Sequence, residues 1–351
     1  FKNVISNGLV LDKNGNKMSK RLGNAVEPFG VIEKYGADAV RWYMITNSSP
    51  WDNLSFDPDG VKEVTSQFFI KLQQAYSFFT MYANVDGFEY KEADIAYTER
   101  PDFDRWLLSE LNTVVKNVQA SLDDYDPTPA GRLIQSFVID KLSNWYIRLN
   151  KPCFQQHREE GMPMSTEKLS AYQTLYTCLE TLSRLIAPVA PFYADQLFRD
   201  LNAVTGKDSS KSVHLAKFPT YNESYIDTEL EQAMESAMKV TSMGLSIRKK
   251  VKIPVIQALQ AIAIPDTDPA FSAQFDGKKF DFSDAQPFAI VKGGAPAGKE
   301  NAIDAITGAT MTSKGLDAAI NAWVKAYAPV FAAAPCCSEE AQAEETTNTE
   351  E

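Results

Sequence analysis

The segment from Gly15 to Asn24 holds the residues whose types and spacing most directly suggest chemistry. It places Lys17 and Lys20 three residues apart on a short loop flanked by glycines, with Met18, Ser19 and Arg21 beside them. Glycine permits close backbone approach, and two ammonium groups suit a triphosphate whose charge must be held while a phosphate bond breaks. We therefore predict a triphosphate site here. The alternative is an exposed basic turn without a ligand, because short motifs also match by chance.

Two further segments combine residues that suit a nucleic acid. Trp145, Arg148 and Lys151 lie close together, and an aromatic ring beside cations can stack on a base while the cations pair with phosphates. Four cations also occupy five positions further along the chain, namely Arg248, Lys249, Lys250 and Lys252. They can follow a phosphate backbone. The alternatives are a core position for Trp145 and a solvated helix end for the second group.

A third candidate site is a threonine-rich motif made of Asp304, Thr307, Gly308, Ala309 and Thr310. Apolar residues at helical spacing follow, so we expect a helix that begins just after the motif. The free N–H groups and the dipole of a helix N-terminus can receive a phosphate. Taken alone, the Thr-Gly-Ala-Thr sequence is also consistent with a simple helix cap.

Composition narrows the classes of protein to consider. The chain has 351 residues, of which 44% are apolar and 23% charged, which is ordinary for a soluble protein of two or three domains. The net charge is −11, but residues 336–351 hold six glutamates and no cation, so the rest is only mildly acidic and nucleic-acid binding is not excluded. Four scattered cysteines predict neither a disulfide framework nor a metal site. No signal peptide or membrane segment is evident, so we expect a cytoplasmic protein.

The elements expected around these residues are mainly helical. Residues 1 to about 60 predict short strands and turns followed by one helix through Val31 and Tyr43. From about residue 59 to 201, apolar residues recur at helical spacing and prolines separate the segments, which indicates a bundle. Pro129 is expected to open one of these helices. Residues 213–215 are expected to be extended, and residues 228–264 to begin with a further helix.

Several of these segments resemble one family. The Lys17–Arg21 loop, the lead-in Asn3–Asp12 and the lead-out Val31–Tyr43 resemble the end of the catalytic domain of class I aminoacyl-tRNA synthetases, and Ser48–Phe56 is similar to the isoleucyl members. Residues 141–150 resemble the anticodon-binding domain of those enzymes, and residues 247–255 resemble the start of their C-terminal region. The resemblance extends to about residue 265. It departs from the family after Asn150, where the basic and aromatic run of the family is absent.

This resemblance implies a substrate set. ATP with Mg²⁺, isoleucine and tRNA(Ile) would be the substrates and partners, and Lys17 and Lys20 would hold the triphosphate while the isoleucine carboxylate attacks the α-phosphate. It also implies that most of the catalytic domain precedes Phe1, so we do not expect the chain to be catalytically competent alone.

A second family is indicated by residues 280–298 and 304–313, which resemble the flavin-binding domain of an FMN-carrying component of the sodium-translocating NADH:quinone oxidoreductase. The match covers residues 271–333. It implies FMN attached to Thr310 through a phosphoester bond, with the preceding motif residues as its recognition sequence, Thr312 as a less favoured acceptor, and a flavin transferase as a partner.

The sequence therefore predicts a mainly α chain of several parts. They are the truncated end of a class I Rossmann-like catalytic domain (1–58), a helical anticodon-binding bundle (59–226), the start of a synthetase C-terminal region (227–265), a small α+β partial FMN-binding domain (271–333) and a disordered acidic tail (334–351). The leading function is a partial isoleucine–tRNA ligase fused to a partial flavin electron-transfer domain. The alternatives are an FMN-carrying component of the sodium-translocating reductase and a tRNA-binding module without catalysis.

Overall fold

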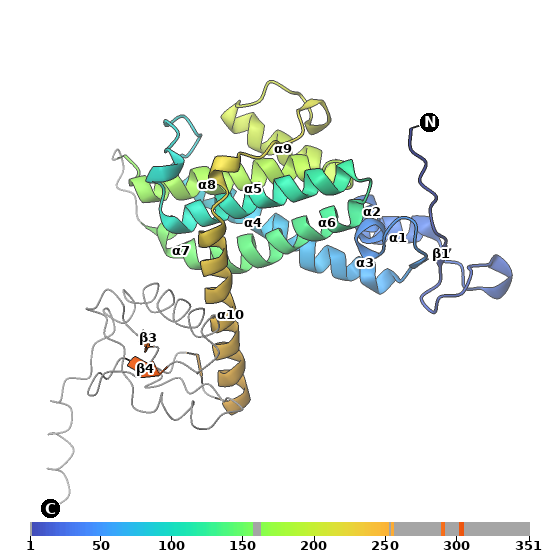
Figure 1. Cartoon of the computed structure of the whole chain (residues 1–351). Helices are drawn as coiled ribbons and strands as arrows, with labels where there is room; N and C mark the ends of the chain where they lie inside the picture. The colour runs from blue at the N-terminus through green and yellow to red at the C-terminus, as the bar shows by residue number, and fades with distance from the viewer. Residues whose placement is uncertain (1, 157–162, 253, 256–288, 292–301, 305–351) are drawn as a thin grey trace, which may run out of the picture. The chain divides into compact units, whose positions relative to one another are not determined.

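The computed structural model describes residues 2–156, 163–252, 254–255, 289–291 and 302–304. The chain divides into an N-terminal unit, Phe1–Thr228, and a C-terminal unit, Glu229–Glu351, and each is described by itself. Helices make up most of the described N-terminal unit (Figure 1), so the prediction of a mainly α chain is confirmed. None of the described helices combines the length and apolar character that crossing a bilayer requires.

The first part of the N-terminal unit contains two short strands and two helices. Strand β1 (Val10–Leu11) pairs in parallel with β2 (Leu54–Ser55). The 3₁₀ turn η1 (Lys20–Leu22) follows β1. The expected single helix is instead two, α1 (Pro28–Tyr35) and α2 (Ala37–Asn47). Gly36 separates them because it adopts φ 87°, while its N–H closes α1 on the carbonyl of Ile32 at 2.8 Å.

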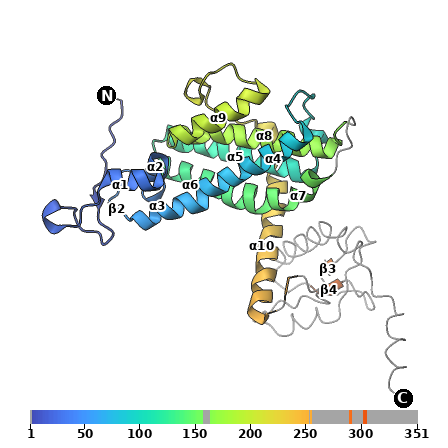
Figure 2. The same cartoon turned by 180° about the vertical axis from the view of Figure 1, so that it is seen from behind.

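A helical bundle follows and confirms the expected sequence of long helices separated by prolines (Figure 2). Two of its members are long helical runs in which a π-helical segment joins two α-helices without a break in helical dihedrals. The elements are α3 (Pro58–Val64), η2 (Thr65–Phe69), α4 (Ile70–Asp86), α5 (Asp102–Asp123), α6 (Pro127–Ser136), η4 (Phe137–Ile147), α7 (Arg148–Gln155), α8 (Thr166–Ile186) and α9 (Pro191–Thr205). Three more 3₁₀ turns lie beside them: η3 (Tyr97–Glu99), η5 (Val213–Leu215) and η6 (Glu223–Tyr225).

Two expectations about local structure are wrong. Helix α6 begins at Pro127 and not at Pro129, because Asp126 caps the N–H of Thr128 at 3.3 Å and Pro127 takes the first helical position. Residues 213–215 form the 3₁₀ turn η5 instead of an extended segment. Its first N–H, on Val213, donates to the Asp195 carboxylate at 3.0 Å, a contact with α9 that local sequence does not reveal.

The bundle core is built from the predicted apolar stripes. Helix α5 buries Trp106, Leu111 and Val118, and α8 buries Leu175 and Leu182. Each fits the helical spacing that places one face against neighbouring helices. Helices α5 and α8 lie side by side in both views (Figure 1, Figure 2).

Helix α2 is anchored to this bundle by an aromatic contact. The Trp42 ring is fully buried and stacks on Phe68 of η2 with ring centroids 4.3 Å apart. Its indole N–H donates to the side-chain oxygen of Gln135 in α6 at 3.2 Å. The segment that follows the Lys17–Lys20 loop is therefore fixed to the bundle.

The described part of the C-terminal unit consists of one helix and two short strands. Helix α10 (Thr228–Val251) carries the expected basic residues in its last turn. Strand β3 (Ala289–Val291) pairs in parallel with β4 (Ala302–Asp304), and the register places Asp304 opposite Val291. Thr307, Gly308, Ala309 and Thr310 lie outside the described residues, as do Thr312 and the acidic tail 334–351.

Candidate functional site

The triphosphate loop, which we define as residues 12–24, is organised by one carboxylate. Asp12 follows β1 and is only 8% exposed, whereas Lys13, Asn14 and Asn16 are exposed. Its Oδ1 accepts the backbone N–H groups of Asn14 at 2.9 Å and Asn16 at 2.8 Å. The Asn16 N–H, followed by other hydrogen bonds, holds the pKa of the Asp12 carboxyl below its ordinary value, so the carboxylate is ionised at neutral pH.

Asn24 closes the other side of the triphosphate loop. Its side-chain N–H₂ group donates to Asp12 Oδ2 at 2.8 Å and to the backbone carbonyl of Lys17 at 3.2 Å. Its side-chain oxygen accepts the N–H of Ser19 at 2.9 Å. Gly23 ends η1 with φ 67°, a left-handed conformation that glycine adopts without strain. One asparagine thus connects the turn at Asp12 with the backbone on both sides of Met18.

The structure places the predicted triphosphate residues as follows. The side chains of Lys17, Lys20 and Arg21 are exposed, while Met18 and Ser19 are half-buried. The Ser19 hydroxyl accepts the N–H of Arg21 at 3.2 Å and so caps η1. The loop therefore presents cations to solvent from a hydrogen-bonded backbone, which is an arrangement that can pair with phosphate oxygens.

Helix α2 connects the triphosphate loop with the bundle through its two ends. At its C-terminal end, the Thr128 hydroxyl donates to the carbonyl of Ile45 at 2.7 Å, and the Arg132 guanidinium donates to the carbonyl of Thr46 at 2.8 Å. Near its start, Arg41 Nε donates to the carbonyl of Val189 at 2.8 Å. These contacts satisfy carbonyls at a helix end and in a turn that would otherwise need water.

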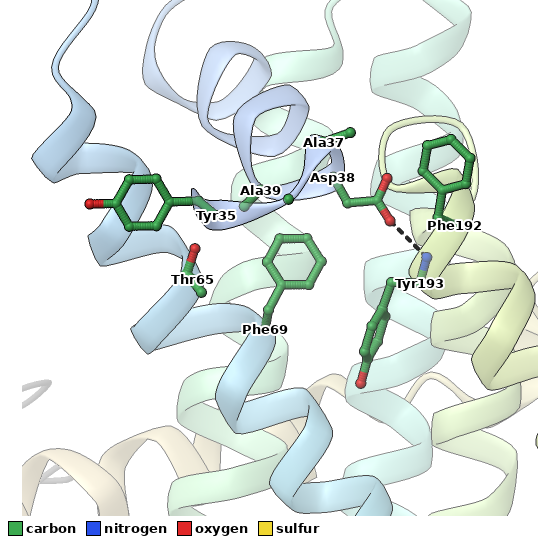
Figure 3. Close-up of a pocket in the computed structure, with 9 residues that line it drawn as sticks. Tyr35, Ala37, Asp38, Ala39, Thr65, Phe69, Phe192 and Tyr193 are labelled. Atoms are coloured by element: carbon green, nitrogen blue, oxygen red, sulfur yellow. Dashed lines mark hydrogen bonds between the residues drawn. The ribbon is translucent and has the colours of Figure 1, made fainter. Parts of the chain in front are cut away.

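A hollow of about 350 Å³ lies where α2 meets η2 and α9 (Figure 3). Phe69, Phe192 and Tyr193 contribute aromatic rings to its wall, and Asp38 contributes a carboxylate. One oxygen of Asp38 accepts the N–H of Tyr193 at 2.7 Å, and the other is buried without a hydrogen-bond partner among the described residues. This carboxylate stands in the first turn of α2 and at the start of α9, two positions where helix dipoles favour negative charge. We interpret the hollow as a packing junction between α2 and the bundle.

The predicted nucleic-acid residues fall into two groups. Trp145 is half-buried in η4, and Arg148 and Lys151 are exposed in the following α7, so one helical run brings these three together. Lys71 of α4 was missed by the sequence analysis, although it reaches the same run and donates to the Asn144 side-chain oxygen at 3.0 Å. Only the contact between α4 and η4 reveals this neighbour.

The second group lies in the C-terminal unit, at the end of α10 and just beyond it. Lys249, Lys250 and Lys252 are exposed, and Arg248 is half-buried with its guanidinium donating to the carbonyl of Pro254 at 2.8 Å. Cations in the last turn of a helix also interact favourably with its dipole. Both a phosphate-binding role and the solvated helix end therefore remain open for this group.

The described residues contain no group of three His, Cys, Asp or Glu side chains that could hold a metal ion. Both oxygens of Asp12 are already engaged by N–H donors, so the triphosphate loop supplies no obvious metal ligand. We accordingly assign no residue of this chain to Mg²⁺.

Three family models match the chain. The model of class I tRNA synthetases for isoleucine, leucine, methionine and valine matches residues 1–57, and the anticodon-binding domain of tRNA ligases matches residues 104–263. An FMN-binding domain matches residues 240–325. The last two matches overlap over residues 240–263, which include the basic end of α10.

Individual relatives agree with the first two matches. The isoleucine–tRNA ligase of Bacteroides fragilis is 62% identical over 279 residues, which are 80% of this chain and 24% of that protein. The isoleucine–tRNA ligase of Bacteroides thetaiotaomicron is 60% identical over 279 residues, with the same shares covered. Among solved structures, the LeuRS–tRNA–LeuAMS complex of Agrobacterium radiobacter K84 is 23% identical with a TM-score of 0.46, and the match covers 63% of this chain and 24% of that one.

The chain thus spans about a quarter of the length of these ligases. The resemblances stated from the sequence are confirmed, although the FMN-binding match begins earlier than residue 271. The chain combines a segment similar to class I isoleucine–tRNA ligases with a segment similar to FMN-binding domains.

Proposed function

We propose that residues 1–228 act as the ATP- and tRNA-handling part of an isoleucine–tRNA ligase. The observation that supports this most strongly is the 62% identity to the Bacteroides fragilis ligase over 279 residues. The geometry agrees, because Lys17 and Lys20 are exposed on a hydrogen-bonded loop. The proposed partners are ATP, isoleucine and tRNA(Ile), and ATP would arrive with Mg²⁺ on its phosphates.

The proposed chemistry is electrostatic. As the isoleucine carboxylate attacks the α-phosphate, negative charge grows on the phosphate oxygens and on the departing pyrophosphate. Ammonium groups that are already in place stabilise this charge without further reorganisation. Lys17 and Lys20 would hold the β- and γ-phosphates in this way, and Arg21 would add a third cation. Loss of either lysine is expected to lower the rate more than it weakens substrate binding.

We further propose that the 351-residue chain on its own does not activate isoleucine. It spans about a quarter of the length of the ligases it resembles, and the class I model matches only residues 1–57 of it. Isoleucine-dependent pyrophosphate exchange is the test. Exchange by the purified chain above an enzyme-free blank would overturn this proposal, whereas exchange at the level of the blank supports it.

The bundle is proposed to bind tRNA through the run from Trp145 to Lys151. Phosphate-led binding weakens steeply with salt, so affinity for tRNA(Ile) should fall between about 50 and 200 mM salt. The double variant Arg148→Ala, Lys151→Ala should bind more weakly and with a smaller salt slope. Lys91→Ala is the matched control, since Lys91 is exposed on a loop and paired with Glu89. An affinity that does not change with salt would contradict this proposal.

These experiments also separate a ligase part from a tRNA-binding module without catalysis. Both proposals predict salt-sensitive tRNA binding by the bundle, but only the ligase proposal requires Lys17 and Lys20 to interact with a triphosphate. Binding of tRNA together with indifference of ATP to Lys17→Ala and Lys20→Ala would favour the module. We propose a cytoplasmic location for either.

A second candidate function is supported by the FMN-binding match at residues 240–325. We propose that the Thr310 hydroxyl forms a phosphoester with FMN and that the flavin carries electrons, as the resemblance to the FMN-carrying component of the sodium-translocating reductase implies. Asp304 at the end of β4 would belong to the motif that a flavin transferase recognises. Lys292 and the glycines that follow it come directly after β3, the partner of β4.

The test of flavin attachment uses two compartments. In the family that the segment resembles, FMN is attached outside the cytoplasmic membrane, so the chain made in the cytosol should carry none. Exported beside a flavin transferase, it should gain FMN, and Thr310→Ala should abolish the product whereas Thr312→Ala should not. The measurement is intact mass with fluorescence of the denatured protein. FMN on the cytosolic form would refute the compartment argument, and FMN on exported Thr310→Ala would show that the acceptor is misassigned.

A further inference from the structure

We propose that Asp12 and Asn24 are positioning residues that hold Lys17 and Lys20 ready for a triphosphate. The inference rests on the proposed function and extends it to two side chains that need not touch the ligand. It starts from a contrast within the triphosphate loop, where the cations are exposed while Asp12 is 8% exposed and Asn24 is half-buried. The acid therefore faces the loop backbone and the cations face solvent.

The hydrogen bonds between these two residues leave no freedom in their chemistry. Three N–H donors converge on Asp12, two from the backbone and one from the Asn24 amide. A carboxylate accepts at both oxygens, so it satisfies all three. Asn24 then has its amide orientation fixed, because its nitrogen faces Asp12 and the Lys17 carbonyl while its oxygen faces the Ser19 N–H.

These contacts hold the backbone on either side of the first lysine. Residues 14 and 16 are fixed before Lys17, the Lys17 carbonyl is fixed itself, and Ser19 is fixed just before Lys20. A loop ordered in advance loses less conformational freedom when a ligand binds, so its affinity for that ligand is higher. The geometry therefore assigns Asp12 and Asn24 an effect on triphosphate affinity that acts through the lysines.

The variant Asp12→Asn separates positioning from simple charge. It keeps the size of the side chain but offers one acceptor oxygen and one N–H₂ group. If the new oxygen meets the two backbone donors, the new N–H₂ group meets the Asn24 amide, and a flip of Asn24 would only move the conflict to Ser19. Simple charge predicts the opposite sign of effect, since removing an anion beside four cations should strengthen the binding of a phosphate ligand.

The exchanged pair Asp12→Asn, Asn24→Asp provides a rescue with unchanged net charge. The amide at position 12 can accept the two backbone N–H groups and donate to the carboxylate at position 24. That carboxylate can also accept the Ser19 N–H, so only the Lys17 carbonyl loses its donor. Lys13→Ala is the control for a lost cation, because Lys13 is exposed on the same turn and donates to none of these groups.

The experiment titrates inorganic tripolyphosphate into the full 351-residue chain at low salt, with the affinity read from ³¹P shifts. Hydrogen exchange of residues 12–24 and the unfolding midpoint of the N-terminal unit are measured on the same samples. Asp12→Asn should bind about tenfold more weakly, equivalent to one lost hydrogen bond to a charged group, with faster exchange in the loop and an unchanged midpoint. The exchanged pair should recover part of the affinity, and Lys13→Ala should change it by less than Lys17→Ala.

The outcomes distinguish this inference from the function on which it rests. Equal or tighter binding by Asp12→Asn, beside weaker binding by Lys17→Ala and Lys20→Ala, would overturn the positioning role and leave the proposed function standing. No loss of affinity in Lys17→Ala and Lys20→Ala, or no binding by the unaltered chain, would overturn both. Weaker binding by Asp12→Asn with partial recovery in the exchanged pair supports both.

Discussion

Replacing Lys168 by methionine is expected to destabilise the N-terminal unit by about 3–5 kcal/mol, the cost of breaking a buried ion pair from one side. Lys168 begins α8 and is only 3% exposed. Its ammonium lies 2.7 Å from the Asp86 carboxylate at the end of α4, and it donates to the carbonyl of Gln156 at 2.7 Å. Tyr172 also donates to this carboxylate, at 2.5 Å. The pair therefore joins three helical segments inside the bundle.

The magnitude follows from what the methionine leaves behind. It fills similar volume, but the Asp86 carboxylate, itself 8% exposed, loses its nearest cation in surroundings where water cannot replace it. Adding Asp86→Asn removes the buried charge while keeping an acceptor for Tyr172, so the double variant should be more stable than Lys168→Met alone. The exposed control Lys91→Met, which breaks the pair with Glu89, should cost about 0–1 kcal/mol.

Urea unfolding followed by tryptophan fluorescence measures these free energies, since Trp42 and Trp106 are fully buried. The free energy of unfolding comes from the midpoint and slope of each curve. A loss below about 1 kcal/mol for Lys168→Met, as for an exposed pair, would refute the reasoning. So would a double variant less stable than Lys168→Met, because the buried charge would then not be the source of the loss.

Three further predictions test the packing and the ionisation of the bundle. Gly131→Ala should cost about 1–3 kcal/mol by overpacking, because the new methyl group would lie 2.7 Å from Thr46 Cγ2; an unchanged urea midpoint would speak against this contact. Tyr146→Phe removes a buried 2.6 Å hydrogen bond to Asp104 and should cost about 1.5–3 kcal/mol in the same assay, whereas a loss within experimental error would mean that the hydroxyl is not needed there. Burial raises the pKa of the Cys153 thiol to about 11, so its alkylation by iodoacetamide in the native chain should be slow at pH 8 and accelerate as pH rises towards that value; a rate at pH 8 equal to that of a free cysteine would contradict it.

The periodic parts of the fold were predictable because burial repeats along a helix. The apolar residues of α5 recur on one face, and they are the residues that the bundle buries, among them Trp106 and Leu111. The break between α1 and α2 was not predictable in this way. Val31, Tyr35 and Ala39 continue one helical period across Gly36, and nothing in that period reveals a positive φ.

Tertiary contacts account for the other differences. The 3₁₀ turn η5 forms because Ser212 and Val213 donate to the Asp195 carboxylate, which approaches from α9. Lys71 reaches Asn144 only because α4 packs against η4. Such contacts join residues far apart in the chain, so local patterns do not contain them.

The candidate site shows the same division. The chemistry of Lys17 and Lys20 follows from their types and spacing, and the structure adds that both are exposed. The support by Asp12 and Asn24 was missed, because it depends on how the chain returns after η1. One signal was present: an Asp followed by Asn-Gly is typical of a turn in which the carboxylate accepts backbone N–H groups.

The most direct test of the central claim is isoleucine-dependent pyrophosphate exchange by a chimaera. In it, residues 1–265 of this chain replace the matching segment of the Bacteroides fragilis ligase, a substitution that the 62% identity should tolerate. We expect kcat within about tenfold of the unaltered ligase, which corresponds to about 1.4 kcal/mol in the barrier. Lys17→Ala or Lys20→Ala in the chimaera should lower kcat more than they raise KM for ATP. A folded chimaera without exchange, or one whose kcat is the same with and without these two lysines, would contradict the account.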